Sequence, residues 1–281
     1  MIPVLEQTLG PRHARTAKAL NERGNALFSL GKLAEAKESH EKALSIRSEI
    51  AGGDTGMDVA ASHINLGNVG TAQRQFDEAL MHQIRAHEIN KELLGDVHPD
   101  VATSLHNIAN VYLDSERFAK ALDTFRESIV VRRKTEVKDH PYLGVSILGT
   151  ADSLFGLKRY SEAEVQYVAS LEIMRKTLGA DHPFNGYGET GLAETLFALQ
   201  RPREAIGPAE RALKIRQGKT MDAGEQGDSR WICARILWAL GKEKERAVRL
   251  AVQAMKNFRV AGVAKRGVGK EVSAWLDERQ P

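Results

Sequence analysis

The stretch VATSLHNIANVYLDSERFAKALDTFRESIVVRRK, residues 101–134, decides the fold. In both of its halves apolar residues recur at i, i+3, i+4 and i+7, the spacing of one face of an α-helix. The polar segment DSER, residues 114–117, separates the two halves. The stretch therefore predicts two helices joined by a short turn.

This pattern recurs along the chain with a period of about 42 residues. Its clearest marker is an alanine in the second helix, which we call the anchor; successive anchors lie 43, 42, 42, 42 and 42 residues apart. Twelve residues before the anchor, a small residue stands in the first five copies, whereas Arg235 falls there in the sixth, which we therefore expect to be degenerate. Because no segment alternates like a strand, the whole chain is predicted to be α-helical. The anchors are Ala36, Ala79, Ala121, Ala163, Ala205 and Ala247.

The order of small and large residues in the unit resembles the tetratricopeptide repeat (TPR), with a small residue at position 8, the anchor at position 20 and a small residue at position 27. A TPR unit usually has 34 residues. The eight extra residues, together with the loops LGDVHP (94–99) and LGADHP (178–183), resemble the kinesin-light-chain type of TPR. The resemblance implies an all-α solenoid, a right-handed superhelix of antiparallel helix pairs with a C-terminal capping helix. Position 24 is Phe125 or Tyr167 in the middle units but His40, Gln83 or Ala209 elsewhere, where we expect looser packing.

Three parts of the chain are predicted. Residues 1–13 resemble the tail of a preceding repeat that is truncated or missing. Residues 261–281 are predicted to form a loop and a capping helix, in which Trp275 and Leu276 cover the last apolar face. This ending resembles the C-terminal TPR region of bacterial eukaryotic-like serine/threonine kinases, which implies an attached kinase domain. Between these ends, residues 14–260 are predicted to hold about six helix pairs, with units near 14–55, 56–97, 98–139, 140–181, 182–223 and 224–260.

Charge and composition argue against several classes of partner. The chain has 40 basic and 37 acidic residues, a net charge of +3, which is too balanced to indicate nucleic acid or an anionic membrane. Its apolar runs are far shorter than the ~18 residues of a membrane-spanning helix. The single cysteine, Cys233, excludes an internal disulfide, and we expect a cytoplasmic protein.

The sequence contains no recognisable catalytic, cofactor or metal motif. The stretch GVAKRGVGKE, residues 262–271, departs from the phosphate-binding loop because Val268 stands where lysine is required. His98, His140 and His182 recur every 42 residues, each directly before a proline, so we interpret them as structural. We therefore predict no catalytic residue, no cofactor and no metal site.

The predicted binding surface is the concave groove, which the first helix of each pair lines in TPR proteins. Asparagine is a poor helix former, so its recurrence in these helices requires a reason. A side-chain amide both donates and accepts hydrogen bonds and can pair with an extended peptide backbone, which is the role that the resemblance implies. Two alternatives stay open: the asparagines join neighbouring helices, or they face water. The predicted partner-binding residues are Asn21, Asn25, Asn65, Asn68, His106, Asn107, Asn110, Asp152 and Glu194.

The groove lining changes from amides to acids at Asp152 and Glu194, which predicts a basic residue in the partner. We thus expect a protein-interaction scaffold that binds a peptide segment of a partner and has no catalytic activity. The alternatives are a regulatory or sensor tail of a bacterial kinase, an enzyme with a site in the groove, and an RNA-binding helical repeat. RNA readers need basic grooves and stacking aromatic residues, whereas this groove is acidic at one end and aromatic residues make up only 6% of the chain.

Overall fold

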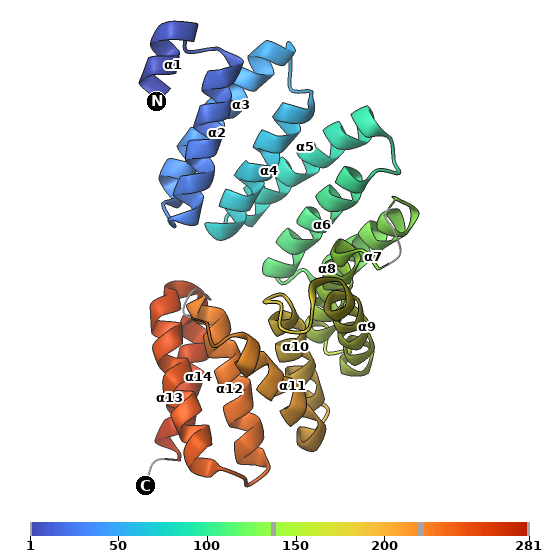
Figure 1. The fold of residues 1–281 in the computed structure, drawn as a ribbon, viewed down its shortest axis with the longest axis vertical. Helices are drawn as coiled ribbons and strands as arrows, with labels where there is room; N and C mark the ends of the chain where they lie inside the picture. The colour runs from blue at the N-terminus through green and yellow to red at the C-terminus, as the bar shows by residue number, and fades with distance from the viewer. Residues whose placement is uncertain (1, 136–138, 219–221, 280–281) are drawn as a thin grey trace. The chain divides into compact units, whose positions relative to one another are not determined.

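The computed structural model describes residues 2–135, 139–218 and 222–279, and these residues are organised as helices (Figure 1). Fourteen α-helices and one 3₁₀ helix lie in the described ranges, which contain no strand. The all-α prediction is therefore confirmed. The chain divides into two compact units, residues 1–138 and 139–281, and each is described by itself.

Unit 1 is a stack of three helix pairs preceded by one short helix. Within each pair the two helices pack along their length, and each pair also contacts the next one. The helices are α1 (Ile2–Leu9), α2 (Ala14–Ser29), α3 (Leu33–Ala51), α4 (Met57–Ala72), α5 (Phe76–Leu94), α6 (Pro99–Asp114) and α7 (Phe118–Thr135).

Unit 2 is a second stack of three pairs, followed by a 3₁₀ turn and a final helix. Pro202 opens a second helix in this unit, in the first turn where proline is tolerated. The elements are α8 (Pro141–Gly156), α9 (Tyr160–Leu178), α10 (Asn185–Ala198), α11 (Pro202–Ile215), α12 (Ala223–Ala239), α13 (Lys244–Ala261), η1 (Gly262–Lys265) and α14 (Arg266–Asp277).

The recurrent histidines begin first helices. The Nδ1 atom of His98 accepts a hydrogen bond from the backbone N–H of Asp100 (3.1 Å), and His13 and His140 do the same for the residue two positions further on. A helix start leaves backbone N–H groups without intrahelical partners, and a side-chain acceptor satisfies one of them. His182 also accepts from the residue two positions further on, the backbone N–H of Phe184 (3.3 Å), but α10 begins only at Asn185. The structural interpretation is thus confirmed for His98 and His140 as helix caps, and His182 makes the same contact in the loop before its helix.

Every pair turns through the same corner. The backbone N–H of Arg117 donates to the Tyr112 carbonyl (2.8 Å), closing a Schellman turn around Glu116, which has φ = 60°. The equivalent left-handed residue is glycine in the first and last pairs, Gly31 and Gly241, and a non-glycine residue in the four pairs between. Because the turn repeats, equivalent positions have the same place within each pair.

Close packing at the anchors holds each pair together. All six anchor alanines are completely buried, and at position 24 Phe125 is completely buried and Tyr167 is 2% exposed. Looser packing at His40 and Gln83 was the wrong expectation, because both are only 1% exposed. The reason is the glycine opposite each: a Cβ added to Gly67 would lie 2.5 Å from Gln83 Nε2. A glycine on the first helix thus makes room for His40 and for Gln83, and Ala209, where looser packing was also expected, is completely buried.

The last pair is in register, contrary to the expectation of a degenerate unit. One extra residue lies in its corner, between Gly241 and the anchor Ala247, compared with the other pairs. The small position is therefore taken by Ala234, which is completely buried, and not by Arg235. Arg235 instead occupies the position of Asn25 and its equivalents on the preceding first helices.

An additional helix packs against the first helix pair and another against the last. At the C-terminus, Leu276 is buried in a cluster with Trp231 and Phe258, and the Trp275 ring packs edge-on against Trp231 at 5.4 Å. Residues 266–270, expected to be loop, form the first part of α14. At the N-terminus, Ile2 of α1 packs against the first pair. That residues 1–13 continue from a missing repeat stays a prediction.

We expect Ala121→Leu to destabilise the chain by roughly 1–3 kcal/mol, because Ala121 has no exposed surface and a larger side chain would overpack the pair. Chemical denaturation followed by circular dichroism measures the effect. Ala119→Leu is the matched control, since Ala119 is exposed on the same helix. Equal midpoints for the two variants would contradict the packing at the anchor.

Candidate binding surfaces

The predicted binding residues lie on first helices in both units. Those numbered 21 to 110 lie on α2, α4 and α6 of unit 1, whereas Asp152 and Glu194 lie on α8 and α10 of unit 2. The predicted series from amides to acids is therefore divided between the two units, and each part is described by itself.

Three of the unit 1 asparagines are bonded within the fold. Asn65 Nδ2 on α4 donates to Asn21 Oδ1 on α2 at 2.8 Å, which joins two neighbouring first helices. Asn68 Oδ1 accepts from Gln83 Nε2 at 3.0 Å, and the same Nε2 also donates to the Ile64 carbonyl at 3.2 Å. For these residues the structure provides the interhelical contacts that the sequence left open as an alternative.

The other three asparagines make no side-chain hydrogen bond to any residue within the described ranges. Asn25 is exposed, whereas Asn107 and Asn110 are half-buried and lie one turn apart on α6. Amides in such positions have donors and acceptors left for another molecule or for water. These three residues are consequently the strongest candidates for contact with a peptide backbone in unit 1.

His106 lies beside this pair of asparagines but is packed against the fold. Its ring meets the Phe125 ring edge-on, with 5.3 Å between centroids. Burial, and to a smaller extent the charge of Arg132, lowers the pKa of His106 to about 4. The imidazole is therefore neutral at pH 7.

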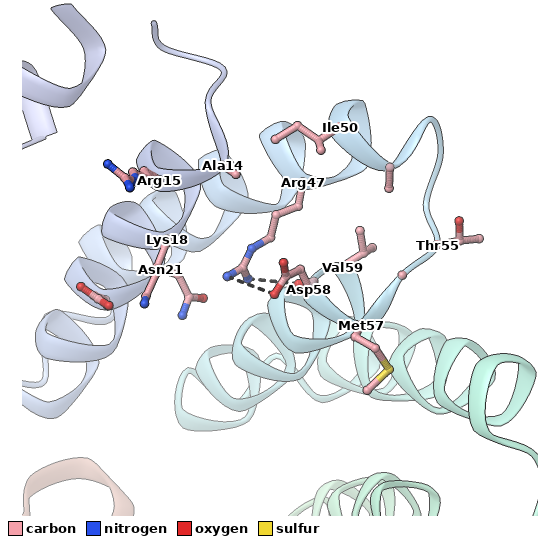
Figure 2. Close-up of a pocket in the computed structure, with 13 residues that line it drawn as sticks. Ala14, Arg15, Lys18, Asn21, Arg47, Ile50, Thr55, Met57, Asp58 and Val59 are labelled. Carbon is pink, nitrogen blue, oxygen red and sulfur yellow. Dashed lines mark hydrogen bonds and ion pairs between the residues drawn. The ribbon is translucent and has the colours of Figure 1, made fainter. Parts of the chain in front are cut away.

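A hollow of about 740 Å³ lies between α2, the end of α3 and the start of α4 in unit 1 (Figure 2). We call it the unit 1 hollow. Lys18 and Asn21 line it from α2, and Ile50 and Met57 add apolar surface that is 55% and 45% exposed. Its residues are Ala14, Arg15, Lys18, Asn21, Glu22, Arg47, Ile50, Ala51, Thr55, Gly56, Met57, Asp58 and Val59.

Arg47 is a charged residue of the unit 1 hollow whose side chain is held in place by hydrogen bonds. Its Nη1 donates to the Ser62 hydroxyl (2.7 Å) and to the Asp58 carbonyl (3.1 Å), and Figure 2 shows the side chain reaching from α3 toward Asp58 on α4. Burial lowers the pKa of Arg47, but guanidinium remains charged at neutral pH. Arg47 therefore connects two helix pairs and is already engaged by the fold.

Asp152 and Glu194 are brought together in unit 2. They line a hollow of about 230 Å³, which shares Phe155, Thr190, Glu194 and Asp228 with an adjoining hollow of about 470 Å³. We call the two together the acidic hollow. The smaller part is lined by Asp152, Phe155, Tyr167, Tyr187, Thr190, Gly191, Glu194, Arg216, Glu225 and Asp228, and the larger part adds Tyr160, Phe197, Ala198, Trp231, Arg235, Lys265, Val268 and Glu271.

Most of the carboxylates in the acidic hollow have partners. The Tyr167 hydroxyl donates to Asp152 Oδ1 (2.6 Å), and Lys265 Nζ lies 2.6 Å from Asp228 Oδ2. The Tyr187 hydroxyl donates to Glu225. Glu194 is different, because no residue in the described part of the chain forms a hydrogen bond or ion pair with it, and the same holds for Glu271 in the larger part of the hollow.

The pKa of Glu194 reflects this isolation. Burial first, and then the charge of Asp228, raises the pKa of the half-buried carboxyl to about 7, against the smaller opposing effects of Arg235 and Lys265. At neutral pH Glu194 is therefore divided between its protonated and ionised forms.

Arg216 is the buried cation of the acidic hollow. Its side chain is 3% exposed, its guanidinium carbon lies 4.5 Å from the Tyr187 ring centroid, and its Nη1 donates to the Glu225 carbonyl (2.9 Å). Its Nη2 lies 3.9 Å from Glu225 Oε2, within ion-pair distance, but neither Nε nor Nη2 has a hydrogen-bond partner. Burial lowers the pKa of Arg216 to about 10, which leaves it charged at pH 7.

Sequence reasoning found two residues of the acidic hollow but missed the rest. Arg235 could have been found by allowing one extra residue in the last corner, since it then aligns with Glu194. Arg216 aligns with Arg47 and Arg132 near the ends of second helices, and this repetition was available in the sequence. Lys265 of η1 has no equivalent in the earlier units, so no repeat pattern could indicate it.

The described ranges contain no group of three or more histidine, cysteine, aspartate or glutamate residues arranged to hold a metal ion. In the same part of the chain, no helix combines the length and apolar character needed to cross a bilayer.

The chain belongs to the tetratricopeptide repeat family. The family profile described as tetratricopeptide repeat matches residues 58–134 and 139–218, and a second profile with this description matches residues 17–49. No curated protein matches the chain. TPR proteins generally mediate protein–protein interactions, and the fold is generally a scaffold without catalytic activity.

Solved structures with the same fold include kinesin-light-chain-like proteins. A candidate kinesin light chain of Podosopora anserina with nearly identical TPR-like repeats is 22% identical, with a TM-score of 0.60, and covers 72% of this chain and 96% of its own. BtubC (BKLC) from P. vanneervenii is 16% identical with a TM-score of 0.61, covering 90% and 92%. The apo form of RapI is 15% identical with a TM-score of 0.65, covering 93% and 99%. The resemblance of the C-terminal end to kinase tails stays a prediction.

We expect Glu194→Gln to stabilise the chain at pH 8 but not at pH 5. The folded state raises the pKa of Glu194 above its value in the unfolded chain, so its contribution to stability is present at low pH and is lost as pH rises toward 8. Removing the charge should therefore recover on the order of 1–3 kcal/mol at pH 8. Thermal melts at the two pH values measure the difference.

The matched control for this prediction is Glu245→Gln. The Glu245 side chain is 95% exposed, so its neutralisation should change stability little at either pH. A Glu194→Gln effect of the same size at pH 5 and pH 8 would show that folding does not raise the pKa of this carboxyl.

Proposed function

We propose that this protein binds an extended segment of a partner protein along the faces formed by its first helices, and that it acts as a cytoplasmic scaffold without catalysis of its own. Asn25, Asn107 and Asn110 are the contacts proposed in unit 1, and Asp152 and Glu194 are those proposed in unit 2. The other predicted residues, Asn21, Asn65, Asn68 and His106, are proposed to shape the same face while bonded or packed within the fold.

One observation carries this proposal. Asn107 and Asn110 are half-buried in mid-helix and make no side-chain hydrogen bond with any described residue. Asparagine lowers helix stability relative to alanine, and a half-buried amide without a partner adds a desolvation cost. Contact with an extended backbone would satisfy both the donor and the acceptor of each amide.

We expect the double variant Asn107→Ala, Asn110→Ala to bind a peptide ligand about 5- to 150-fold more weakly, from a loss of roughly 0.5–1.5 kcal/mol per hydrogen-bonding amide. The probe is the tightest binder selected from a displayed library of random 12-residue peptides, made synthetically and titrated by calorimetry. The melting temperature should stay constant or rise, because alanine is the better helix former.

Two further variants separate binding from stability. Gln253→Ala removes an exposed amide from a second helix and should leave affinity unchanged. Asn68→Ala should lower the melting temperature, because it removes an acceptor from Gln83, which is only 1% exposed. Unchanged affinity in the Asn107/Asn110 variant would contradict the proposed function in unit 1.

A further inference from the structure

We propose that the acidic hollow of unit 2 binds a lysine or arginine side chain of the partner, with its charged end against Glu194 and its backbone carbonyl against Arg216. The inference rests on the proposed function, since it takes the ligand to be a segment of a partner protein. It adds the chemistry by which one residue of that segment is recognised.

The size and walls of the smaller part suit a single long side chain. Its volume of about 230 Å³ lies below the usual range of small-molecule pockets, ~300–1,000 Å³. Phe155, Tyr167 and Tyr187 supply aromatic surface to it. Aromatic faces attract ammonium and guanidinium groups and also cover the aliphatic stems of these side chains.

The charges in the smaller part favour a cation. Four carboxylates line it, those of Asp152, Glu194, Glu225 and Asp228, against the single cation Arg216. Of these acids, Glu194 has no hydrogen bond or ion pair with the described residues. Tyr167 holds Asp152, Lys265 holds Asp228, and Tyr187 and Arg216 hold Glu225. An arriving cation therefore has an unpaired carboxylate to meet.

Arg216 supplies the second, independent indication of a ligand. It lines the same part of the hollow and is 3% exposed, and its Nη2 lies 3.9 Å from Glu225 Oε2, an ion pair too long to be a hydrogen bond. Its Nε and Nη2 therefore keep no hydrogen-bond partner. Buried donors without partners are rare in folded proteins because each carries a desolvation cost. A carbonyl oxygen of the bound segment would accept from this guanidinium while the side chain of the same residue reaches Glu194.

Binding of a cation should depend on pH through Glu194. The groups that act on its carboxyl are Asp152 from α8, Tyr167 from α9, Arg216 from the end of α11, Asp228 and Arg235 from α12, and Lys265 from η1. Glu271 of α14 lines the larger part of the hollow. With the pKa of Glu194 near 7, the cation binds the ionised form, so affinity should rise by about tenfold from pH 6 to pH 8 as a proton is released.

The test uses the whole chain and four blocked pentapeptides, Ac-Ala-Ala-X-Ala-Ala-NH₂, where X is lysine, arginine, norleucine or glutamate. Binding is followed by shifts of the Thr190 and Gly191 backbone amides in NMR spectra. The lysine and arginine peptides should bind at least about tenfold more tightly than the other two, a difference of ~1.4 kcal/mol. Glu194→Gln should remove this preference and the pH dependence, whereas Glu245→Gln, with the same change of charge, should preserve both.

The alternative outcomes each overturn the proposal. Equal affinities for the lysine and norleucine peptides would exclude recognition of charge. Butylamine binding as tightly as the lysine peptide would assign the hollow to free amines and leave Arg216 without a role. Because this readout lies in unit 2 and the Asn107/Asn110 test lies in unit 1, either proposal can fail without the other.

Discussion

The close approach of two helices at the anchor alanine is the contact on which the remaining structure depends. All six anchors are completely buried, which fixes how deeply each second helix lies against its first. A Schellman turn ends the first helix of every pair, so that equivalent register positions have the same place within their pairs. The binding face is therefore a consequence of backbone packing, and its chemistry can vary without altering the stack.

That chemistry is controlled from the buried second helix. At position 24, Gln83 donates to Asn68, and Tyr167 donates to Asp152, each on the first helix of its own pair. Space for these side chains comes from small residues nearby, since a Cβ on Gly191 would lie 2.4 Å from the Tyr167 ring. A substitution at position 24 thus changes which side chain on the exposed face is held and which is left available.

The sequence was sufficient to predict those structural features that repeat along the chain, and the cap that must cover an apolar end. The anchors, the histidines that begin first helices and the cap around Leu276 all follow from periodicity or from the need to cover an apolar end. It was insufficient where one residue breaks the period: the extra residue before Ala247 moved Arg235 out of the core position assigned to it. Pairings between elements, such as Lys265 with Asp228, depend on three-dimensional placement that no single-chain pattern encodes.

The contrast between equivalent positions in the two units bears on why Glu194 is acidic. Asn68 stands at the same register position in unit 1, and its neutral amide shares a hydrogen bond with Gln83 at no electrostatic cost. Glu194 has no such partner, and burial beside Asp228 raises its pKa to about 7, so its ionised form weakens the fold. A side chain that lowers stability without a compensating internal contact is typical of functional positions. A cation from a partner would offset this cost, because it stabilises the ionised carboxylate only in the complex.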